Sequence, residues 1–508
     1  MVYKVLTYSL TGIEANLVEV EADISHGLPA FNIVGLPEST IKESKERIRS
    51  AIKNSKLPFP EHRITINLAP ADLKKEGTSF DLPIATALIS ASLNLPLELL
   101  KKFLIAGELS LNGEVRKTKG ALSAAFLSKS INLSGLILPY ESSNEVAFFT
   151  DVPVYPVKHL LDVVAFLKGD LNIQPVKKED IRYDAKLSFD IDFSDVAGQF
   201  HAKRALEIAS AGKHNVLMFG PPGSGKTMMA MRLPTIMTDM SLEESLETTM
   251  IYSAAGLLSE ENPIILKRPF RAPHHTASEI AIVGGGANPK PGEISLAHNG
   301  ILFLDEFPEF KRPVIEALRQ PLEEGFIHIS RATTSVIFPA NFLLIAAMNP
   351  CPCGNLGDST KPCTCSFTQI QKYRKKLSGP ILDRIDIHIE VPRVSATELS
   401  HNMISAETSA QIKERVKLAR EIQKERFKST TLLNSKMTTT MIKKYCKLDN
   451  ESQKLLNNAI EKFKYSARTY NKILKLARTI ADLDGSSQIL QVHLAEAIQL
   501  RGLDKQVF

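Results

Sequence analysis

The pattern of apolar and polar positions changes twice along the chain. Up to about residue 170, short β-rich runs alternate with stretches of helical periodicity, which is typical of an α/β domain. The next part, up to about residue 392, contains continuous apolar runs of the kind found in a parallel sheet that is covered on both faces. From about residue 395 onwards, helical periodicity predominates. We therefore predict two α/β domains followed by a helical domain.

The predicted elements and domain boundaries follow from these changes. Strands are expected at 64–68, 135–138, 215–219, 300–304 and 342–347. Helices are expected at 39–55, 81–93, 121–129, 410–427, 438–445, 452–463, 467–483 and 492–500. The polar, charged and weakly periodic segment 174–192 is typical of a linker. The predicted domains are residues 1–173, 193–394 and 395–508.

Length and composition agree with a globular protein of about three domains. The 508 residues are 44% hydrophobic and 23% charged, which excludes a disordered or collagen-like chain. The net charge is only +6, but residues 401–480 hold 18 Lys and Arg against 7 Asp and Glu. Such a basic segment suits a polyanionic partner such as nucleic acid, and a solvated helical face is the alternative.

Neither a membrane segment nor a disulfide framework is visible in the sequence. No apolar run approaches the roughly 18–20 residues that a membrane helix needs. The first residues lack the charged and apolar regions of a signal peptide. Four of the five cysteines fall between residues 351 and 365, which is not the spacing of a disulfide scaffold. We therefore predict a cytoplasmic protein with no membrane partner.

The most specific motif is a phosphate-binding loop. Residues 220–227 match the eight-residue P-loop pattern, and they follow an apolar strand and open a helix, which is the context that the motif requires. The glycines let backbone N–H groups converge on phosphate oxygens at the positive end of the following helix. Lys226 is expected to neutralise the β- and γ-phosphates of ATP, and the Thr227 hydroxyl to bind Mg²⁺. The predicted nucleotide-binding residues are Gly220, Pro221, Pro222, Gly223, Ser224, Gly225, Lys226, Thr227 and Asp305.

Two other predicted strands end in groups that suit nucleotide hydrolysis. Asp305 and Glu306 follow the strand at 300–304, at the edge where open α/β sheets place ligand-binding residues. Asp305 is expected to hold Mg²⁺, commonly through water, and Glu306 to polarise the attacking water. Asn349 follows the strand at 342–347 and is placed to bond the γ-phosphate or that water. The alternatives are an acidic pair that solvates a strand end and a routine Asn-Pro turn.

The order of P-loop, acidic strand and polar strand resembles the AAA+ ATPases, in which Asn349 matches the sensor-1 position. The segment 377–386 resembles the arginine-finger segment of the magnesium-chelatase and replicative-helicase branch, which implies that Arg384 reaches the γ-phosphate of a neighbouring subunit. Arg468 matches the sensor-2 position, which implies a contact with the γ-phosphate from the lid. Surface salt bridges are the alternative for both arginines. A finger that acts between subunits implies a homo-oligomeric ring, most often a hexamer in this family.

Further motifs resemble one group within that branch. The segments 269–278, 283–286, 290–300 and 329–332 are similar to the magnesium-chelatase-like proteins of the YifB/ComM group. The resemblance covers nearly the whole chain. It implies a Lon-protease-like α/β domain, an AAA+ P-loop motor with three α/β/α layers and a C-terminal helical lid. ComM proteins are associated with natural transformation, as ring helicases that drive branch migration of DNA joints.

Two inserts in the motor region are candidates for DNA contact. The first, 268–292, is rich in glycine, proline, histidine and basic side chains, and the second is predicted to be a hairpin of strands at 326–330 and 335–338. In the related branch both inserts point into the pore of the ring. The candidates for phosphate contact are Arg271, Lys290 and Arg331. The alternative is that the inserts only stabilise the ring interface.

Cysteines and histidines are the other candidate metal ligands. Four thiolates can complete a tetrahedral structural zinc site, although the C-x-C spacing here is tighter than the usual C-x₂₋₄-C. The predicted zinc ligands are Cys351, Cys353, Cys363 and Cys365. Reduced cysteines in a buried loop are the alternative. His274 and His275 are expected to bond loop backbone, with metal binding as the alternative, and Cys446 to lie in a helix core.

The N-terminal region resembles the Lon proteolytic fold at 75–82 and 107–115, and Ser79 falls where Lon carries its nucleophile. A nucleophilic serine needs an adjacent base. The corresponding lysine position is Leu122, whereas Lys117 and Lys119 are out of register. We therefore predict an inactive scaffold or docking domain.

The preferred function is an ATP-driven ring motor that acts on single-stranded or branched DNA, with ATP, Mg²⁺ and a structural zinc ion as its cofactors. Three alternatives stay open. They are a motor subunit of a metal chelatase, an ATP-dependent Lon-like protease, and an assembly scaffold that uses ATP only for ring formation. DNA-stimulated hydrolysis separates the chelatase subunit from the preferred function. Casein degradation that Ser79→Ala abolishes would indicate the protease, and function retained in Glu306→Gln would indicate the scaffold.

Overall fold

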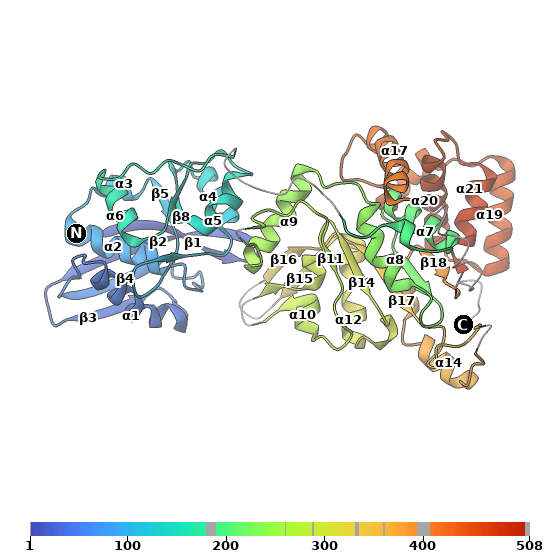
Figure 1. Ribbon diagram of the computed structural model, residues 1–508, viewed down its shortest axis with the longest axis horizontal. Coiled ribbons are helices and arrows are strands. Elements are labelled where there is room, and N and C mark those ends of the chain that lie inside the picture. Colours follow the sequence, from blue (N-terminus) through green and yellow to red (C-terminus); the bar gives the residue numbers. More distant parts are fainter. Residues whose placement is uncertain are drawn as a thin grey trace.

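The computed structural model describes residues 2–178, 189–259, 261–286, 289–330, 335–358, 361–393 and 407–502. The molecule is elongated, with an N-terminal α/β domain at one end, a central α/β domain and a helical domain at the other end (Figure 1). Within the described residues, no helix combines the length and apolar character needed to cross a membrane. Most of the predicted linker and the junction between the second and third domains lie outside these residues, so the domain boundaries stay predictions.

The N-terminal domain is built on a seven-stranded mixed sheet. Its strands are β1 (Tyr3–Thr11), β2 (Glu14–Ser25), β3 (Ala30–Val34), β4 (Arg63–Ala69), β5 (Phe103–Ile105), β8 (Gly135–Pro139) and β9 (Val154–Val157), in the order β3-β4-β2-β1-β5-β8-β9. A separate short ladder joins β6 (Glu108–Leu109) and β7 (Val115–Arg116). The helices are α1 (Ser39–Asn54), α2 (Asp81–Leu93), α3 (Leu97–Leu100), α4 (Ala121–Ser130), α5 (Tyr140–Ala147) and α6 (Leu160–Lys168). Helix α2 is buried from Asp81 to Ser90, which explains why its sequence lacks a polar face.

The central domain contains a sheet of five parallel strands. They are β10 (Val216–Phe219), β11 (Phe270–Arg271), β14 (Ile301–Leu304), β17 (Leu343–Met348) and β18 (Ile387–Glu390), in the order β11-β14-β17-β10-β18. Every neighbouring pair is parallel. Alternate residues belong to two different cores, because Met218 and Phe303 point to one face while Leu217 and Leu304 point to the other. Burial on both faces accounts for the continuous apolar runs in the sequence.

Helices cover both faces of this parallel sheet. They are α7 (Phe200–Gly212), α8 (Lys226–Arg232), α9 (Leu242–Ala255), α10 (Glu279–Val283), α11 (Glu293–Leu296), α12 (Arg312–Ala317), α13 (Arg319–Glu324), α14 (Phe367–Arg374) and α15 (Gly379–Leu382), with 3₁₀ turns at Phe193–Asp195, Leu233–Thr235 and Phe307–Glu309. Helix α7 packs on one face and α12 on the other. Two antiparallel ladders extend from the domain, β12 (Gly284–Gly285) with β13 (Lys290–Pro291), and β15 (Phe326–Ser330) with β16 (Ser335–Pro339).

The helical domain shares its core with the central domain. Its helices are α17 (Ser409–Phe427), α18 (Thr439–Tyr445), α19 (Asn450–Phe463), α20 (Ala467–Leu483) and α21 (Gln491–Gln499), with a 3₁₀ turn at Asn434–Lys436. Leu476 and Ile480 of α20 lie in the same apolar cluster as Ile208 of α7 and Met218 of β10. The lid and the sheet are therefore stabilised by one continuous apolar core.

Part of the basic excess of the lid is internal. The Arg420 guanidinium donates to Ser210 O at 2.6 Å, and burial lowers the pKa of Arg420 to about 9. Arg478 is 2% exposed and is bonded to Asp482 Oδ1 at 3.0 Å and to Ser487 O at 2.9 Å. Arg420 thus links the lid to α7 of the central domain, and Arg478 stabilises the lid itself. The surface charge available to a polyanion is therefore smaller than the sequence count.

The N-terminal domain rests on helix α9 of the central domain (Figure 1). Gly120 N donates to Ser253 O at 3.1 Å, and Ser253 Oγ donates to Glu145 Oε1 at 2.6 Å. Burial raises the pKa of Glu145 to about 7. The turn at Gly12 touches the β15–β16 hairpin, since a Cβ atom there would lie 2.3 Å from Val336 Cγ1. One of the two inserts therefore packs against the N-terminal domain.

Most predicted elements are confirmed to within one or two residues. The apolar runs at 215–219, 300–304 and 342–347 form β10, β14 and β17, and the predicted hairpin forms β15 and β16. The turn of this hairpin, which includes Arg331, lies outside the described residues. Helix α19 begins two residues before the expected start because the Asp449 carboxylate caps it by accepting from Ser452 N at 2.7 Å. The sequence reading did not identify β11 and β18 of the parallel sheet.

Candidate functional site: a P-loop with arginines on the opposite sheet edge

The P-loop connects the end of β10 to the start of α8, as the motif predicts. At its first position only glycine fits, because a Cβ atom on Gly220 would lie 2.0 Å from Val391 O. Gly223 and Gly225 have φ angles of +76° and +90°, which favour glycine. Residues 220–227 thus form a tight turn that leads directly into the first turn of α8. This is the arrangement that binds phosphate in P-loop proteins.

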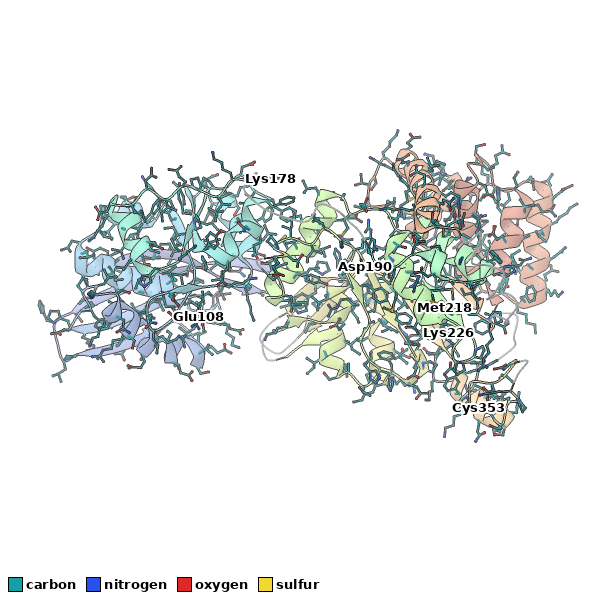
Figure 2. The ribbon with its side chains drawn as sticks, in the orientation of Figure 1. Glu108, Lys178, Asp190, Met218, Lys226 and Cys353 are labelled. Atoms are coloured by element: carbon teal, nitrogen blue, oxygen red, sulfur yellow. The ribbon has the colours of Figure 1, made fainter. Side chains whose placement is uncertain are left out.

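Lys226 lies inside this loop, next to the end of β10 (Figure 2). Its ammonium group donates to Gly220 O at 2.7 Å and to Pro221 O at 2.9 Å. The residue is 8% exposed, and burial lowers the pKa of Lys226 to about 8. These hydrogen bonds go to neutral oxygens, and the Asp305 carboxylate is the charged group that attracts the ammonium, so an added phosphate anion would be strongly favoured here.

Two oxygen groups suited to Mg²⁺ meet beside the lysine. Thr227 Oγ1 donates to Asp305 Oδ2 at 2.8 Å, and Asp305 directly follows β14. Oxygen ligands of octahedral Mg²⁺ lie about 2.0–2.1 Å from the ion, so neighbouring ligands are about 2.9 Å apart. The Thr227 and Asp305 oxygens therefore fit two adjacent positions of such a site.

Glu306 has a partner that the sequence reading did not identify. Its carboxylate lies 3.1 Å from Nδ1 of His275, which belongs to the loop between β11 and α10. Glu306 itself has a φ of +51°, an uncommon conformation for a side chain of this size, and its side chain is 53% exposed. Because β11 is the neighbour of β14, the loop after β11 reaches the acidic pair at the carboxyl edge of the sheet.

Asn349 completes the carboxyl edge. It follows β17, which lies between β14 and β10 in the sheet, and Met348 O accepts from Gly220 N at 3.2 Å. The strand order thus brings Asn349 between the P-loop and the acidic pair. Five of the predicted side chains, those of Lys226, Thr227, Asp305, Glu306 and Asn349, are gathered at one edge of the sheet.

Arg384 lies at the opposite, amino-terminal edge of the sheet. It precedes β18, and its carbonyl accepts from Asn215 Nδ2 at 3.3 Å, one residue before β10 begins. The four residues of β10, about 13 Å at 3.3 Å per residue, separate this position from the P-loop. The Arg384 guanidinium donates to Pro380 O at 2.6 Å and pairs with Glu323 Oε1 at 2.7 Å.

Arg468 lies beside Arg384. It is the second residue of α20, and its guanidinium is 3.6 Å from the same Glu323 oxygen. One turn later, Lys472 Nζ pairs with Asp386 Oδ1 at 2.7 Å, which fixes the start of α20 at the amino edge. The expected contact of Arg468 with a γ-phosphate is therefore not available within its own P-loop.

A cavity of about 320 Å³ lies between these arginines and the lid. It is lined by more cations than carboxylates, with Lys213, Arg384, Lys436, Arg468, Lys472 and Lys475 against Glu323, Asp383 and Asp386. Burial alone would raise the pKa of Asp386, but Lys472 and His214 hold it well below its usual range. Burial lowers the pKa of Lys213 to about 7. The amino edge thus presents a predominantly positive pocket.

The candidate DNA contacts have different surroundings. The Arg271 guanidinium is paired with the Glu293 carboxylate, at 2.6 and 2.7 Å. Lys290 is exposed on β13 and lines a cavity of about 390 Å³ between the N-terminal and central domains. Arg331 lies outside the described residues. Of the two candidates within the described residues, Lys290 is thus exposed, whereas Arg271 is half-buried and paired.

Ser79 lines the same cavity as Lys290. Among the described residues, no lysine or histidine is hydrogen-bonded to its hydroxyl, and the Lys117 ammonium donates to Leu258 O of the central domain instead. Leu122, at the expected lysine position, is fully buried. The arrangement around Ser79 lacks the base that a nucleophilic serine needs.

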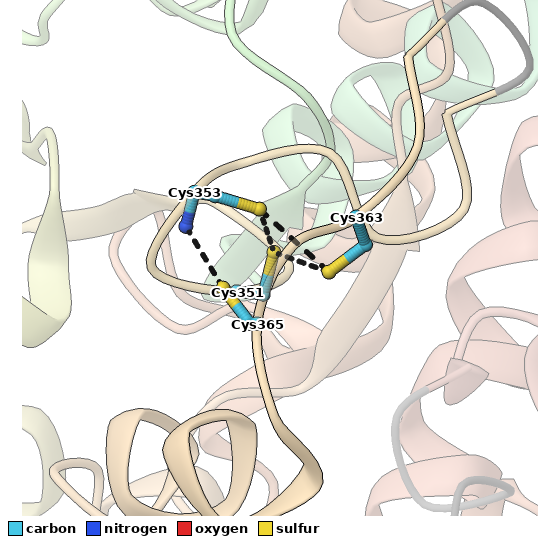
Figure 3. Close-up of side chains that lie close together, drawn as sticks. All are labelled: Cys351, Cys353, Cys363 and Cys365. Atoms are coloured by element: carbon cyan, nitrogen blue, oxygen red, sulfur yellow. Dashed lines mark hydrogen bonds between the residues drawn. The ribbon is translucent and has the colours of Figure 1, made fainter.

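The four predicted cysteine ligands converge in the loop between β17 and α14 (Figure 3). Their sulfur atoms all lie within 4.8 Å of one another. Among the described residues, this is the one group of three or more cysteine, histidine or carboxylate side chains arranged to hold a metal ion, so His274 and His275 do not form such a group. The adjacent histidine rings pack against each other instead, with centroids 4.2 Å apart and ring planes tilted by 34°.

Comparisons with known proteins cover the whole chain. Family models of the magnesium chelatase subunit ChlI match residues 192–399, 20–142 and, for its C-terminal part, 406–501. The competence protein ComM of Haemophilus influenzae is 47% identical over 97% of this chain and 96% of its own length. The protein YifB of Escherichia coli is 44% identical over 98% of this chain and 97% of its own length.

A more distant relative shares part of the chain. The DNA replication licensing factor mcm-6 of Caenorhabditis briggsae is 23% identical over 41% of this chain and 26% of its own length. The matches to ComM and YifB, by contrast, extend over nearly all of both proteins. This chain therefore belongs to the magnesium-chelatase-like AAA+ family that includes ComM and YifB, a membership that indicates an ATPase using ATP and Mg²⁺.

Proposed function

We propose that the protein is an ATP-hydrolysing ring motor that acts on DNA. The observation that supports this proposal is the position of the candidate site residues at two opposite edges of one sheet. The P-loop and the acidic pair lie at the carboxyl edge of the sheet, whereas Arg384 and Arg468 lie at the amino edge. A head-to-tail contact between copies brings one edge against the other, and such contacts close into rings when the rotation allows.

Each residue of the combined site has a role in this proposal. Lys226 binds the β- and γ-phosphates, and Thr227 and Asp305 would hold Mg²⁺, which neutralises phosphate charge when bound. Glu306 accepts a proton from the water that attacks the γ-phosphorus, as the bond to the β-phosphate oxygen breaks.

Residues from two further positions complete the site. Asn349 orients the attacking water from the next strand of the same protomer. Arg384 and Arg468 of the adjacent protomer stabilise the charge that develops on the γ-phosphate, and the product ADP and phosphate then leave. A ring of six copies is the assembly that the family resemblance implies.

DNA is the proposed substrate of the motor, and branch migration during transformation is the proposed activity. The basic lid, exposed Lys290 and the hairpin that carries Arg331 support attraction to phosphate. Two relatives carry names that refer to competence and to DNA replication licensing, which also supports this choice. The magnesium chelatase models favour one second candidate, a chelatase motor subunit, whose hydrolysis is independent of DNA.

The test is ATP hydrolysis by the purified protein without DNA and with single-stranded, duplex or four-way DNA. Stimulation by DNA that disappears in Lys226→Ala supports a DNA motor that uses this site. Hydrolysis that no DNA form changes favours the chelatase candidate, and an absence of hydrolysis contradicts both.

We also propose that Cys351, Cys353, Cys363 and Cys365 hold a structural zinc ion, since their sulfur atoms converge.

A further inference from the structure

The cysteine loop lacks the usual means of holding a fixed shape. In the described part of 351–366, no helix or strand forms, and its large aliphatic side chain, Leu356, is only half-buried. Cys351 is buried and the other three cysteines are half-buried. A loop without its own apolar core needs a cross-link to hold one conformation, and a structural metal ion supplies such a link.

The sulfur geometry fits zinc. Cys351 Sγ lies 3.4 Å from Cys353 Sγ and 3.7 Å from Cys363 Sγ, and the Cys353 and Cys363 sulfur atoms are 3.6 Å apart. Tetrahedral zinc with Zn–S bonds of about 2.3 Å sets sulfur atoms about 3.8 Å apart. A disulfide would need about 2.05 Å.

The fourth sulfur atom has a backbone donor. Cys353 N donates to Cys365 Sγ at 3.4 Å (Figure 3). Hydrogen bonds of this kind stabilise thiolate ligands and fix their orientation around a metal ion. This contact and the convergence of all four sulfur atoms suit Cys365 as the fourth ligand of a tetrahedral site.

The same loop is in direct contact with the P-loop. Gly354 follows the second cysteine and has a φ of +80°, and a Cβ atom at this position would lie 2.6 Å from Pro222 Cδ. That Cβ atom would also lie 4.0 Å from Asn349 Cγ. The backbone at Gly354 is thus pressed against the nucleotide-binding loop, with no room for a side chain between them.

A second contact holds the other side of the cysteine loop. The Arg393 guanidinium pairs with the Asp358 carboxylate at 3.2 Å, and Asp358 is 1% exposed in its side chain. Arg393 follows β18, close to Val391, whose carbonyl approaches Gly220 of the P-loop. The cysteine loop therefore lies between two segments that border the nucleotide site.

We propose that zinc bound by the four cysteines holds this loop against Pro222, and that zinc occupancy sets the affinity of the P-loop for nucleotide. The inference rests on the nucleotide site of the proposed function, which it extends by a metal-dependent support. Without the metal, the loop samples other conformations, and Pro222 and Asn349 lose the surface against which they pack. The P-loop must then be ordered by the nucleotide itself, which weakens binding.

The test uses the full chain and two independent measurements, zinc content by elemental analysis and the dissociation constant of a fluorescent ATP analogue. The wild-type protein is expected to contain about one zinc ion per chain, as four thiolates fill one tetrahedral site. The double substitution C353S/C365S is expected to remove the zinc and to weaken nucleotide binding on the order of tenfold. The matched control is Cys446→Ser, outside the cluster in the lid core, which is expected to keep both zinc and affinity.

Two further samples separate metal binding from folding and from the P-loop contact. Wild-type protein is stripped of zinc by a mercurial and a chelator, and excess free thiol then removes the mercurial from the cysteines. It is expected to bind nucleotide as weakly as the double variant, and to recover when zinc is restored. Gly354→Ala is expected to keep zinc but to weaken nucleotide binding, because the new methyl group displaces Pro222. Circular dichroism checks that each sample is folded.

Each outcome has one meaning. Wild-type protein without zinc overturns the metal site, and nucleotide affinity that is equal with and without zinc overturns the coupling. Wild-type protein that holds zinc but binds no nucleotide contradicts the proposed ATPase instead. In that case the effect of Gly354→Ala on nucleotide affinity cannot be measured. The proposed coupling is then contradicted together with the ATPase.

Discussion

The two edges of the parallel sheet differ in the contacts that their candidate site residues make. At the carboxyl edge, the polar groups contact one another directly, with Thr227 2.8 Å from Asp305 and Glu306 3.1 Å from His275. At the amino edge, Arg384 and Arg468 converge on the single carboxylate of Glu323, far from any phosphate-binding loop of their own chain. One edge brings together the groups that bind and hydrolyse ATP in the proposed function, and the other presents two arginines that share one carboxylate.

This difference indicates that, within one protomer, Arg384 and Arg468 cannot reach a nucleotide bound at their own P-loop. Arginine side chains that stabilise phosphoryl transfer must contact the transferring phosphoryl group. Within one chain, β10 separates Arg384 from the P-loop by its full length. Glu323 Oε1 contacts both arginines, at 2.7 Å and 3.6 Å, and in the proposed ring a γ-phosphate oxygen of the neighbouring protomer replaces it. Oligomerisation is therefore part of the catalytic site in this proposal.

The largest expected effect is that of Arg384→Ala, which is expected to lower the rate of ATP hydrolysis about 10³–10⁵-fold, as for other arginine fingers. Arg374→Ala, at the end of α14, is the matched control and is expected to leave the rate unchanged. Steady-state phosphate release measures both. A rate that survives Arg384→Ala contradicts the proposed role of the amino edge.

Mixing two inactive variants tests the comparison of the edges directly. Arg384→Ala protomers keep the carboxyl edge, and Glu306→Gln protomers keep the arginines. Mixed rings therefore contain some interfaces with two intact halves and are expected to regain part of the activity. Equal mixtures that stay inactive after subunit exchange show that both halves act within one chain.

The motif-bearing edge of the site was more predictable from sequence than the other. The P-loop, the acidic pair and Asn349 each follow an apolar run, and the carboxyl ends of parallel strands meet at one sheet edge. The strand that locates Arg384 was missed. In β18 (Ile387–Glu390), Ile387 and Ile389 alternate with polar residues, so the strand is indicated by a period of two and not by the continuous apolar run that marks β10, β14 and β17.

Partners contributed by other helices and loops could not be predicted either. Glu323 is on α13 and His275 is in a loop, and their contacts with Arg384 and Glu306 arise from packing between elements distant in sequence. The same holds for Gly354, whose contact with Pro222 depends on the path of the cysteine loop. The cysteines themselves were predictable, because four of them occur within one short segment.

The next largest effect is expected at the carboxyl edge. Glu306→Gln is expected to lower the hydrolysis rate about 10²–10⁴-fold, the usual contribution of a general base, while nucleotide still binds. Glu309→Gln is a control on the same segment, where the carboxylate pairs with Lys376 at 2.8 Å. Binding of a fluorescent ATP analogue separates loss of catalysis from loss of affinity. If Glu306→Gln also abolishes binding, Glu306 supports the structure of the site instead.

A smaller effect is expected away from both edges, at the proposed DNA contacts. Lys290→Ala is expected to reduce the slope of log affinity against log salt by about 0.7–0.9, the value for one phosphate contact. Lys290→Arg keeps the charge and is expected to keep the slope. Arg271→Ala is expected to lower thermal stability instead, since it leaves the Glu293 carboxylate without the guanidinium that it contacts. Fluorescence anisotropy over a salt series measures the slopes, and an unchanged slope in Lys290→Ala removes this residue from the DNA surface.

The smallest effect concerns Glu323, the residue that defines the resting state of the amino edge. Arg384 and Arg468 must leave this carboxylate before they reach a neighbouring nucleotide, and a partly exposed ion pair is worth about 0–1 kcal/mol. Glu323→Gln is therefore expected to raise the hydrolysis rate at low protein concentration by at most about fivefold. Glu324→Gln, whose carboxylate accepts from Gln320 Nε2 at 2.9 Å, is the matched control. If Glu323→Gln instead lowers activity as much as Arg384→Ala, Glu323 does not define a resting state. It would then hold the two arginines in their active positions, and the two edges would be equally preorganised.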